Sequence, residues 1–299
     1  MVSEVAMKTP ASLPALVRAL RPRQWIKNGV LLAGIIFTLD AHHPLGDWLR
    51  VAAAIAVFCA LASSIYLVND ICDVEQDRQH PRKMHRPIAS GAISIPTAVT
   101  MAVCLALIGM AGAVALGFWF ALTAAGYIVL TVSYSFWLKH EAIVDVLALA
   151  TCYVARAWAG AVVIGVDMSP WLFICTFLAA LLIGLAKRRS ELLSLDNATG
   201  HRRSLDGYTL PMLDQMIGIA TSCTLMAYIL YTVVSATGQQ RPLLRLTIPL
   251  VVYGIYRFFF MIHREGKGGD PTAELMEDRG VILCGLLWVL VCVAAMLVR

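Results

Sequence analysis

Nine apolar stretches, each close to the length of a membrane-spanning helix, constrain this chain more than any other feature. A helix needs about 20 predominantly apolar residues to cross the hydrocarbon core of a bilayer. The stretches lie at residues 24–40, 50–69, 97–116, 119–138, 142–163, 169–187, 211–235, 246–263 and 279–298. The pattern predicts an all-α, polytopic membrane protein with nine transmembrane helices bundled around a central cavity.

The boundary between the third and fourth stretches is the weakest, because only Gly117 separates them. The pattern is therefore also compatible with eight or ten spans. Composition supports a membrane protein: 14% of the residues are charged, against about 25% in a typical soluble domain. The chain contains no soluble appendage, so we expect residues 1–299 to form a single transmembrane domain.

Basic residues are unevenly distributed among the connections. They cluster before the first apolar stretch and after the second, sixth and eighth, whereas the alternate connections hold only Arg50, Arg241 and Arg245. Lys and Arg are enriched on the cytoplasmic side of membrane proteins, which predicts a cytoplasmic N-terminus. The two long polar connections, at about 70–96 and 188–210, lie on this predicted cytoplasmic side. Because long loops in compact bundles are often functional, we expect both to be catalytic.

An acidic motif, Asn69-Asp70-Ile71-Cys72-Asp73-Val74-Glu75-Gln76-Asp77, directly follows the second apolar stretch. On a continuous helix, Asp70, Asp73 and Asp77 lie within about 60° of one another. Their carboxylates repel each other unless a cation lies among them, and Mg²⁺ typically joins one or two carboxylates to substrate phosphates. The spacing predicts a Mg²⁺ site formed by the three aspartates with Asn69. The alternative is a solvated acidic helix end.

A basic segment follows the acidic motif, and Pro81 and Pro87 predict that it forms a loop. Lys83 and Arg86 are the residues expected to return toward the carboxylates and bind a diphosphate. Arg suits this role as a bidentate donor and Lys as a point charge. Attachment to the membrane surface is the alternative for each of them.

The stretch from Asn69 to Gly91 has the form N-D-x-x-D-x-x-x-D-x-x-H-P-x-K-x-x-R-P-I-A-x-G. It resembles the UbiA-type intramembrane prenyltransferase superfamily. Four shorter segments are similar to its decaprenyl-phosphate phosphoribosyltransferase branch: R-P-R-Q-W-I-K-N from Arg21, S-Y-S from Ser133, Asp145 with R-A-x-A-G from Arg156, and K-R-x-x-E from Lys187.

This resemblance implies a Mg²⁺-dependent transfer of 5-phosphoribose from phosphoribosyl diphosphate to a polyprenyl (decaprenyl-type) phosphate, with release of pyrophosphate. It implies a cavity open to the cytoplasm under the charged loops and sideways to lipid, in a protein of the inner (plasma) membrane. The product would be a precursor for cell-wall arabinan. Membrane lipids are expected contacts and nucleic acids are not, and a homo-oligomer is left open.

A second polar group, Lys187, Arg188 and Glu191, ends the sixth apolar stretch. Most prenyltransferases of the superfamily carry a second aspartate motif at this place, which holds another Mg²⁺. The mostly cationic set in this chain suits a substrate phosphate better, and so favours the phosphoribosyl interpretation. Lys187 and Glu191 are four residues apart and share a helix face, so an ion pair at the helix end is the alternative.

Asp145 and Arg156 are charged residues inside the fifth apolar stretch. A charge near the bilayer centre costs at least about 2.5–3.5 kcal/mol. The two share a helix face about 16 Å apart, so each needs a partner on another helix or on a substrate. Lys27 is expected either to meet a phosphate or to reach the lipid headgroups. Tyr134 is a candidate hydrogen-bond partner of a sugar or phosphate.

Two other functions remain open at this stage. The same metal site would serve a prenyltransferase that moves a prenyl group from a prenyl diphosphate to an aromatic acceptor. A transporter or lipid scaffold is less compatible with the sequence, because transporters place their sites near the midplane whereas these carboxylates gather at one membrane face.

Overall fold

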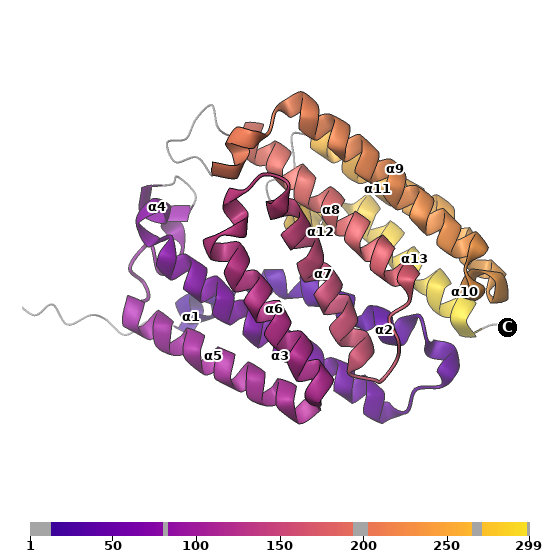
Figure 1. The fold of residues 1–299 in the computed structure, drawn as a ribbon, viewed down its shortest axis with the longest axis horizontal. Helices are drawn as coiled ribbons and strands as arrows, with labels where there is room; N and C mark the ends of the chain where they lie inside the picture. Colours follow the sequence, from indigo (N-terminus) through magenta and orange to yellow (C-terminus); the bar gives the residue numbers. More distant parts are fainter. Residues whose placement is uncertain (1–12, 80–82, 194–202, 265–270, 298–299) are drawn as a thin grey trace, which may run out of the picture.

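The computed structural model describes residues 13–79, 83–193, 203–264 and 271–297, and within these ranges the chain is helical and contains no strand (Figure 1). Eight of its helices are long and apolar enough to cross a membrane. They are α3 (Leu45–Cys72), α5 (Ile95–Leu116), α6 (Phe118–Phe136), α7 (Val144–Val162), α8 (Pro170–Leu193), α9 (Leu210–Val234), α11 (Ile248–Arg264) with the 3-10 helix η7 (Pro242–Thr247) before it, and α13 (Arg279–Leu297). The predicted all-α membrane fold is confirmed.

Short helices connect the long ones. They are α1 (Leu13–Ala19), η1 (Pro22–Leu31), α2 (Leu32–Ile36), η2 (Leu39–Ala41), α4 (Val74–Gln79), η3 (Lys83–His85), η4 (Leu138–His140), η6 (Arg203–Gly207), α10 (Ala236–Gln240) and α12 (Pro271–Glu277). Between α5 and α6 the connection is Gly117 alone, with φ of 134°. Only glycine adopts this conformation readily, so the predicted boundary at Gly117 is confirmed.

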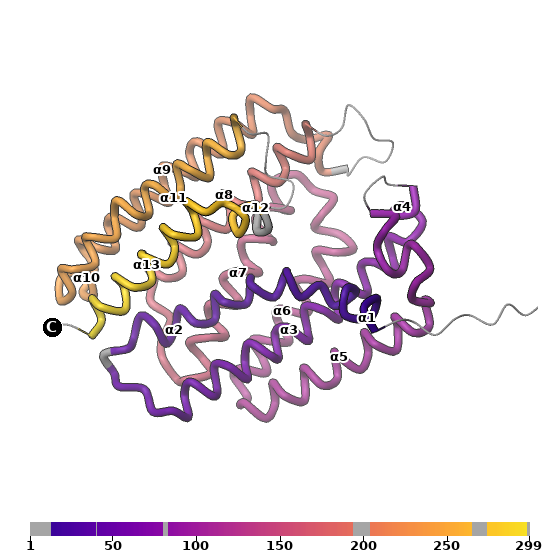
Figure 2. The backbone as a smooth tube through the Cα atoms, turned by 180° about the vertical axis from the view of Figure 1, so that it is seen from behind, coloured from indigo at the N-terminus to yellow at the C-terminus, as the bar shows by residue number. Residues whose placement is uncertain are grey.

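The prediction of one continuous helix at 24–40 is wrong. This segment consists of η1, α2 and η2, which cross the bundle between α3 and α13 (Figure 2). Its backbone lies against α7 where glycines allow close approach: a Cβ on Gly160 would overlap the carbonyl oxygen of Leu31, and a Cβ on Gly34 would lie 3.0 Å from the Ala161 backbone. Packing against α7 therefore overrides the apolar pattern, and the described residues hold eight long helices, not nine.

The long helices lie side by side, and from α5 to α9 each packs on the next in the chain (Figures 1 and 2). The most buried of them is α7, which α6, α8 and the N-terminal segment surround. Outward-facing positions elsewhere carry large apolar side chains; examples are Leu107, Phe118 and Leu290, each more than 60% exposed. Such exposed apolar surface suits contact with lipid.

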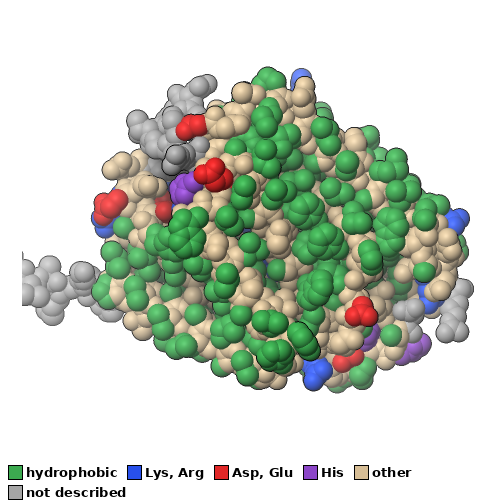
Figure 3. All heavy atoms as spheres, viewed as in Figure 1, with side chains coloured by type: hydrophobic (Ala, Val, Ile, Leu, Met, Phe, Trp, Pro, Cys, Tyr) green, Lys and Arg blue, Asp and Glu red, His purple; other side chains and the backbone are tan. Residues whose placement is uncertain are grey.

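Polar side chains gather at the ends of the helices. On the face shown in Figure 3, hydrophobic side chains cover the middle, and most charged and histidine side chains lie toward the two ends. One end is formed by the C-termini of α3, α6, α8 and α11 and the N-termini of α5, α7, α9 and α13. It also carries α4, η3 and η4, and is called the charged end below.

Gly160→Ala tests the contact between the N-terminal segment and α7. The added methyl group would force Leu31 and η1 away from α7, and we expect a loss of about 1–3 kcal/mol, as for other overpacked sites. Gly126→Ala is the matched control, because nothing lies within 4 Å of its added Cβ. Apparent melting temperatures in detergent should fall for Gly160→Ala and stay level or rise for Gly126→Ala. Equal melting temperatures would contradict the close contact.

Candidate active site

The acidic motif lies at the charged end, where α3 passes into α4. Although α3 ends at Cys72, the backbone keeps its four-residue hydrogen-bond spacing: the Asp73 amide donates to the Asn69 carbonyl at 2.9 Å, and the Asp77 amide donates to the Asp73 carbonyl at 2.8 Å. Asp70 and Asp77 consequently face the same side, and each is only 2% exposed.

Two arginines neutralise these buried carboxylates. Arg86 Nη1 lies 3.0 Å from Asp70 Oδ1 and 2.6 Å from Asp77 Oδ2, so one nitrogen joins both acids. Arg21 Nη2 lies 2.5 Å from Asp70 Oδ1, and its guanidinium carbon lies 5.1 Å from the centroid of the Tyr66 ring. A buried carboxylate is strongly destabilising without such partners, so both arginines are part of the site.

The other two predicted metal ligands, Asp73 and Asn69, have different surroundings from the buried pair. Asp73 is 34% exposed and its Oδ1 lies 3.7 Å from Lys139 Nζ, while Asn69 lines a small hollow between α3, α5 and α6. Among the residues that the structure describes, no three His, Cys, Asp or Glu side chains are grouped to hold a metal ion. The pair Asp70 and Asp77 remains, and two carboxylates are the usual protein share of a Mg²⁺ site that also contacts phosphates.

Lys83 lies in η3, within the first of the two charged loops. Its pKa is lowered by burial and then by the nearby charge of Arg86, and the acids Asp77, Glu191 and Asp73 act in the opposite direction. Glu191 belongs to the end of α8 and the other two to the acidic motif. Lys83 therefore links the two predicted catalytic regions electrostatically.

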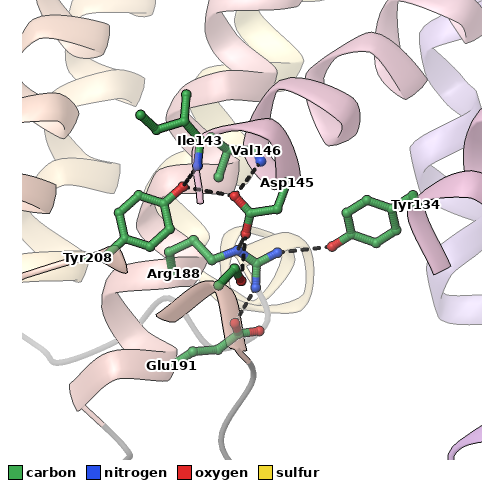
Figure 4. Close-up of polar contacts among 8 residues, drawn as sticks. Tyr134, Ile143, Asp145, Val146, Arg188, Glu191 and Tyr208 are labelled. Carbon is green, nitrogen blue, oxygen red and sulfur yellow. Dashed lines mark hydrogen bonds and ion pairs between the residues drawn. The ribbon is translucent and has the colours of Figure 1, made fainter. Parts of the chain in front are cut away.

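The second polar group is built around an ion pair between α7 and α8 (Figure 4). Asp145 and Arg188 are both fully buried, and Arg188 Nε lies 2.7 Å from Asp145 Oδ2. Tyr208 donates to Asp145 Oδ1 at 2.8 Å, and Ser204 donates to Oδ2 at 3.3 Å. The expectation that Asp145 finds a partner on another helix is confirmed.

The two remaining nitrogens of the Arg188 guanidinium also bind protein side chains. Its Nη1 pairs with Glu191, and its Nη2 donates to the Tyr134 hydroxyl at 3.0 Å (Figure 4). Arg188 is therefore occupied by protein partners in this structure, and its predicted contact with a substrate phosphate stays a prediction. Lys187, the preceding residue, is half-buried.

Arg156 is buried deeper in the bundle and is held by neutral partners. Its Nε donates to Asn28 Oδ1 at 2.9 Å, its Nη1 to the Cys152 carbonyl at 3.2 Å and its Nη2 to the Tyr127 hydroxyl at 2.7 Å. The predicted partners on other helices are thus present, on η1 and α6. Lys27, on the same 3-10 helix as Asn28, is half-buried.

An apolar cavity of about 620 Å³ lies inside the bundle. Side chains of η1, α2, α7, α8, α9, α11 and α13 line it, and no charged residue is among them. Along α8 the lining extends from Trp171 to Ile183, about 18 Å at the helical rise. Tyr153 lies in the wall, with its ring centroid 5.4 Å from the guanidinium carbon of Arg156. The predicted opening of a cavity toward the charged loops stays a prediction.

Comparison with known proteins relates this arrangement to one family. A match to the UbiA prenyltransferase family covers residues 30–276, most of the chain. The chain belongs to the UbiA prenyltransferase family. It is therefore a multi-pass membrane enzyme of the transferase class.

Individual relatives extend the likeness over nearly the whole length. The decaprenyl-phosphate phosphoribosyltransferase of Mycobacterium tuberculosis (strain H37Rv) is 32% identical over 295 residues, covering 97% of each chain. The protein of the same name from Corynebacterium glutamicum is 33% identical over 287 residues, covering 94% of this chain and 86% of the relative. The structure of a UbiA homolog from Archaeoglobus fulgidus bound to GPP and Mg²⁺ covers 95% of this chain and 100% of its own, with a TM-score of 0.71 at 17% identity.

Several contact residues were not predicted. Arg21, Lys139, Tyr208 and Ser204 all contact predicted site residues in this family member. The one feature of the sequence that pointed to Arg21 is its position in the R-P-R-Q-W-I-K-N segment. Its left-handed backbone (φ 53°) and its contact with Asp70 depend on the break in the N-terminal helix, which the sequence did not predict. Lys139, Ser204 and Tyr208 lie in short 3-10 helices or loops whose position the apolar pattern does not determine.

Arg86→Ala tests whether the carboxylate pair binds a divalent cation. Removing one member of a buried ion pair costs about 3–5 kcal/mol, and the 28% exposure of Arg86 reduces that cost. We expect a lower apparent melting temperature in EDTA, and a larger rise on adding MgCl₂ than wild type shows, because a cation can replace the lost charge.

Arg78→Ala is the control for this experiment. Arg78 pairs with Glu75 at the surface, where ion pairs contribute about 0–1 kcal/mol. Arg78 Nε also donates to the Ala89 carbonyl at 3.3 Å, so the melting temperature of Arg78→Ala should fall slightly, by less than that of Arg86→Ala, whereas its response to Mg²⁺ should match that of wild type. If Arg86→Ala responds to Mg²⁺ no more than Arg78→Ala does, the carboxylate pair is not a cation site.

Proposed function

We propose that this protein transfers 5-phosphoribose from phosphoribosyl diphosphate to a polyprenyl phosphate and releases pyrophosphate. The observation that carries the proposal is the pair of buried carboxylates, Asp70 and Asp77, bound by Arg21 and Arg86 at the charged end of a membrane bundle. Relatives named decaprenyl-phosphate phosphoribosyltransferase, alike over nearly the full length, support the choice of donor and acceptor.

In this proposal the donor diphosphate binds at the acidic motif. Asp70 and Asp77 would hold Mg²⁺, with Asp73 and Asn69 turning toward it only when the site is loaded. Bound Mg²⁺ would neutralise charge on the diphosphate and on the departing pyrophosphate. Arg86, Arg21 and Lys83 supply further positive charge there, and such electrostatic stabilisation is usually the largest catalytic contribution.

The acceptor lipid would place its tail in the apolar cavity. Ile183 lines that cavity, and Lys187 lies four residues later on the same face of α8. Lys187 is therefore about 6 Å further toward the charged end, where the lipid phosphate would lie, and Lys27 is a second cation for it. The phosphate oxygen is already anionic near neutral pH, so the reaction requires no strong general base.

The orientation in the membrane belongs to the same proposal. The charged end carries the basic connections, and the positive-inside rule places it in the cytoplasm, where a soluble sugar-phosphate donor is available. The lipid product would then serve as a precursor for cell-wall arabinan in the inner (plasma) membrane. Arg156 and Tyr134 have structural partners in the described part of the chain, and act in this proposal by holding η1 and Arg188 in place.

Prenyl transfer to an aromatic acceptor is the second candidate. It is favoured by the fold shared with UbiA homolog structures bound to GPP or DMAPP and Mg²⁺. Purified protein given radiolabelled phosphoribosyl diphosphate, polyprenyl phosphate and MgCl₂ should form a labelled lipid, and EDTA should abolish it. Absence of that lipid, with turnover of a prenyl diphosphate and an aromatic acid, would establish the second candidate instead.

Substitutions in the acidic motif should reduce this transfer. Asp70→Asn and Asp77→Asn each remove a buried negative charge that would hold the cation, and we expect kcat to fall about 10²-fold or more. Asp73→Ala should also reduce transfer, because it removes a carboxylate proposed to bind Mg²⁺ when the donor is present. Glu75→Ala is the control, because Glu75 is 76% exposed and forms a surface ion pair with Arg78. Full activity of Asp73→Ala would remove Asp73 from the site.

Lys83 predicts how the reaction depends on pH. Burial and Arg86 lower the pKa of Lys83, so this lysine loses its charge at a lower pH than an exposed one. If Lys83 binds the diphosphate, kcat/KM for the donor falls as pH rises through that pKa. Lys83→Arg should move this alkaline limb to higher pH, because a guanidinium stays protonated up to a pH of about 12. An unmoved limb would assign the titration to another group.

A further inference from the structure

The network around Arg188 joins a buried carboxylate to one at the surface. Two carboxylates, those of Asp145 and Glu191, flank one guanidinium. Asp145 is fully buried and saturated: besides Arg188 it accepts hydrogen bonds from Tyr208, Ser204 and its neighbour's amide, that of Val146 at 2.8 Å. Glu191 is the acidic member of the network with solvent contact, since its side chain is 28% exposed, so its negative charge is presented at the charged end.

The geometry of Arg188 fixes where this charge is presented. Its planar guanidinium contacts Asp145 on α7, Tyr134 on α6 and Glu191 on its own helix (Figure 4). Because that fork is rigid, the Glu191 carboxylate is held in a set position relative to three helices. Arg188 itself has no exposed surface, so any effect on a substrate is exerted through Glu191.

Glu191 interacts electrostatically with Lys83, one of the residues assigned above to the donor. Lys83 lies within electrostatic reach of Glu191 on one side and of Asp77 and Asp73 on the other. A group bound among Asp77, Arg86 and Lys83 would therefore lie beside Glu191. A carboxylate repels phosphate oxygens, but it has about four acceptor positions for hydroxyl groups, and part of the Glu191 side chain is open to solvent.

We infer that Glu191 recognises the ribose hydroxyls of the donor, and that Arg188 and Asp145 are positioning residues that hold it there. This inference rests on the proposed phosphoribosyl transfer. A ribosyl donor presents ring hydroxyls, whereas a prenyl diphosphate presents none. A site built to bond a hydroxyl rejects analogues that lack it by about 10⁴–10⁵-fold, so Glu191 is the feature that selects a sugar donor over a prenyl donor.

Two fragments of the donor separate ribose recognition from diphosphate binding. Ribose 5-phosphate carries the hydroxyls without the diphosphate, and pyrophosphate is the diphosphate without the sugar. In Glu191→Ala, we expect the KM for phosphoribosyl diphosphate and the inhibition constant of ribose 5-phosphate to rise about 10- to 100-fold, as for loss of hydrogen bonds to a charged group. The inhibition constant of pyrophosphate should stay within about twofold of wild type, the size of effect typical of a surface substitution.

The positioning residues give a second measurement. Arg188→Lys keeps the charge but loses the fork, and should raise the same two constants in the same direction. Glu191→Gln keeps an acceptor oxygen, and its constants should lie between those of wild type and Glu191→Ala. Glu75→Ala is the matched control, because it removes a carboxylate from the same end of the protein. It should leave the inhibition constants of both fragments unchanged. The melting temperature of each variant shows whether it is folded. If Glu191→Ala does not fold, Glu191→Gln takes its place in the test.

Each remaining outcome is decisive. Unchanged KM in Glu191→Ala and Glu191→Gln would overturn the role of Glu191 alone. A parallel rise for pyrophosphate and ribose 5-phosphate, reversed by added MgCl₂, would assign Glu191 to a cation instead of the ribose. Failure of the wild-type protein to form any labelled lipid would overturn the proposed function, and the inference with it.

Discussion

Two buried carboxylates at the boundary between membrane and water are the constraint on which the site depends. Asp70 and Asp77 are almost inaccessible to solvent, and each must be compensated where it lies. Arg86 meets both, and Arg21 meets the first. These contacts attach the N-terminal segment and the loop after α4 to the end of α3. The charges of the proposed donor site thus also determine its local fold.

The two polar centres at the charged end differ in how firmly their cations are held. The side chains of Arg21 and Arg86 are each 28% exposed, whereas Arg188 has no exposed surface. An arginine that already contacts water can exchange a carboxylate for a phosphate oxygen at little cost in desolvation. A fully buried one with two acidic partners cannot. The first centre is therefore suited to binding and release, and the second to acting as a fixed frame.

The sequence was sufficient for the features that depend on local pattern. Apolar runs predicted the eight long helices of the described residues to within about six residues at each end, and Gly117 marked the turn between α5 and α6. The sequence also predicted that Asp145 and Arg156, the charged residues in α7, have partners on other helices, and both do. The prediction of a continuous N-terminal helix was wrong because the conformation of this segment depends on close backbone contacts at Gly34 and Gly160, which lie far apart in the chain. The pairing of Arg188 with Asp145 could not be read from the sequence, because the two residues are 43 positions apart in the chain.

One face of α8 orders the proposed substrates along the membrane normal. Ile183, Lys187 and Glu191 follow one another at four-residue intervals, each about 6 Å beyond the last. The first lines the apolar cavity, the second is a half-buried cation and the third is the carboxylate held by Arg188. An amphiphilic acceptor with its tail in the cavity would bring its phosphate to the level of Lys187. A ribose bound by Glu191 would then lie next to that phosphate on the side of the charged end, with its diphosphate toward Lys83 and Arg86. Such an order places the attacking oxygen and the leaving group on opposite sides of the sugar, as a displacement at its anomeric carbon requires.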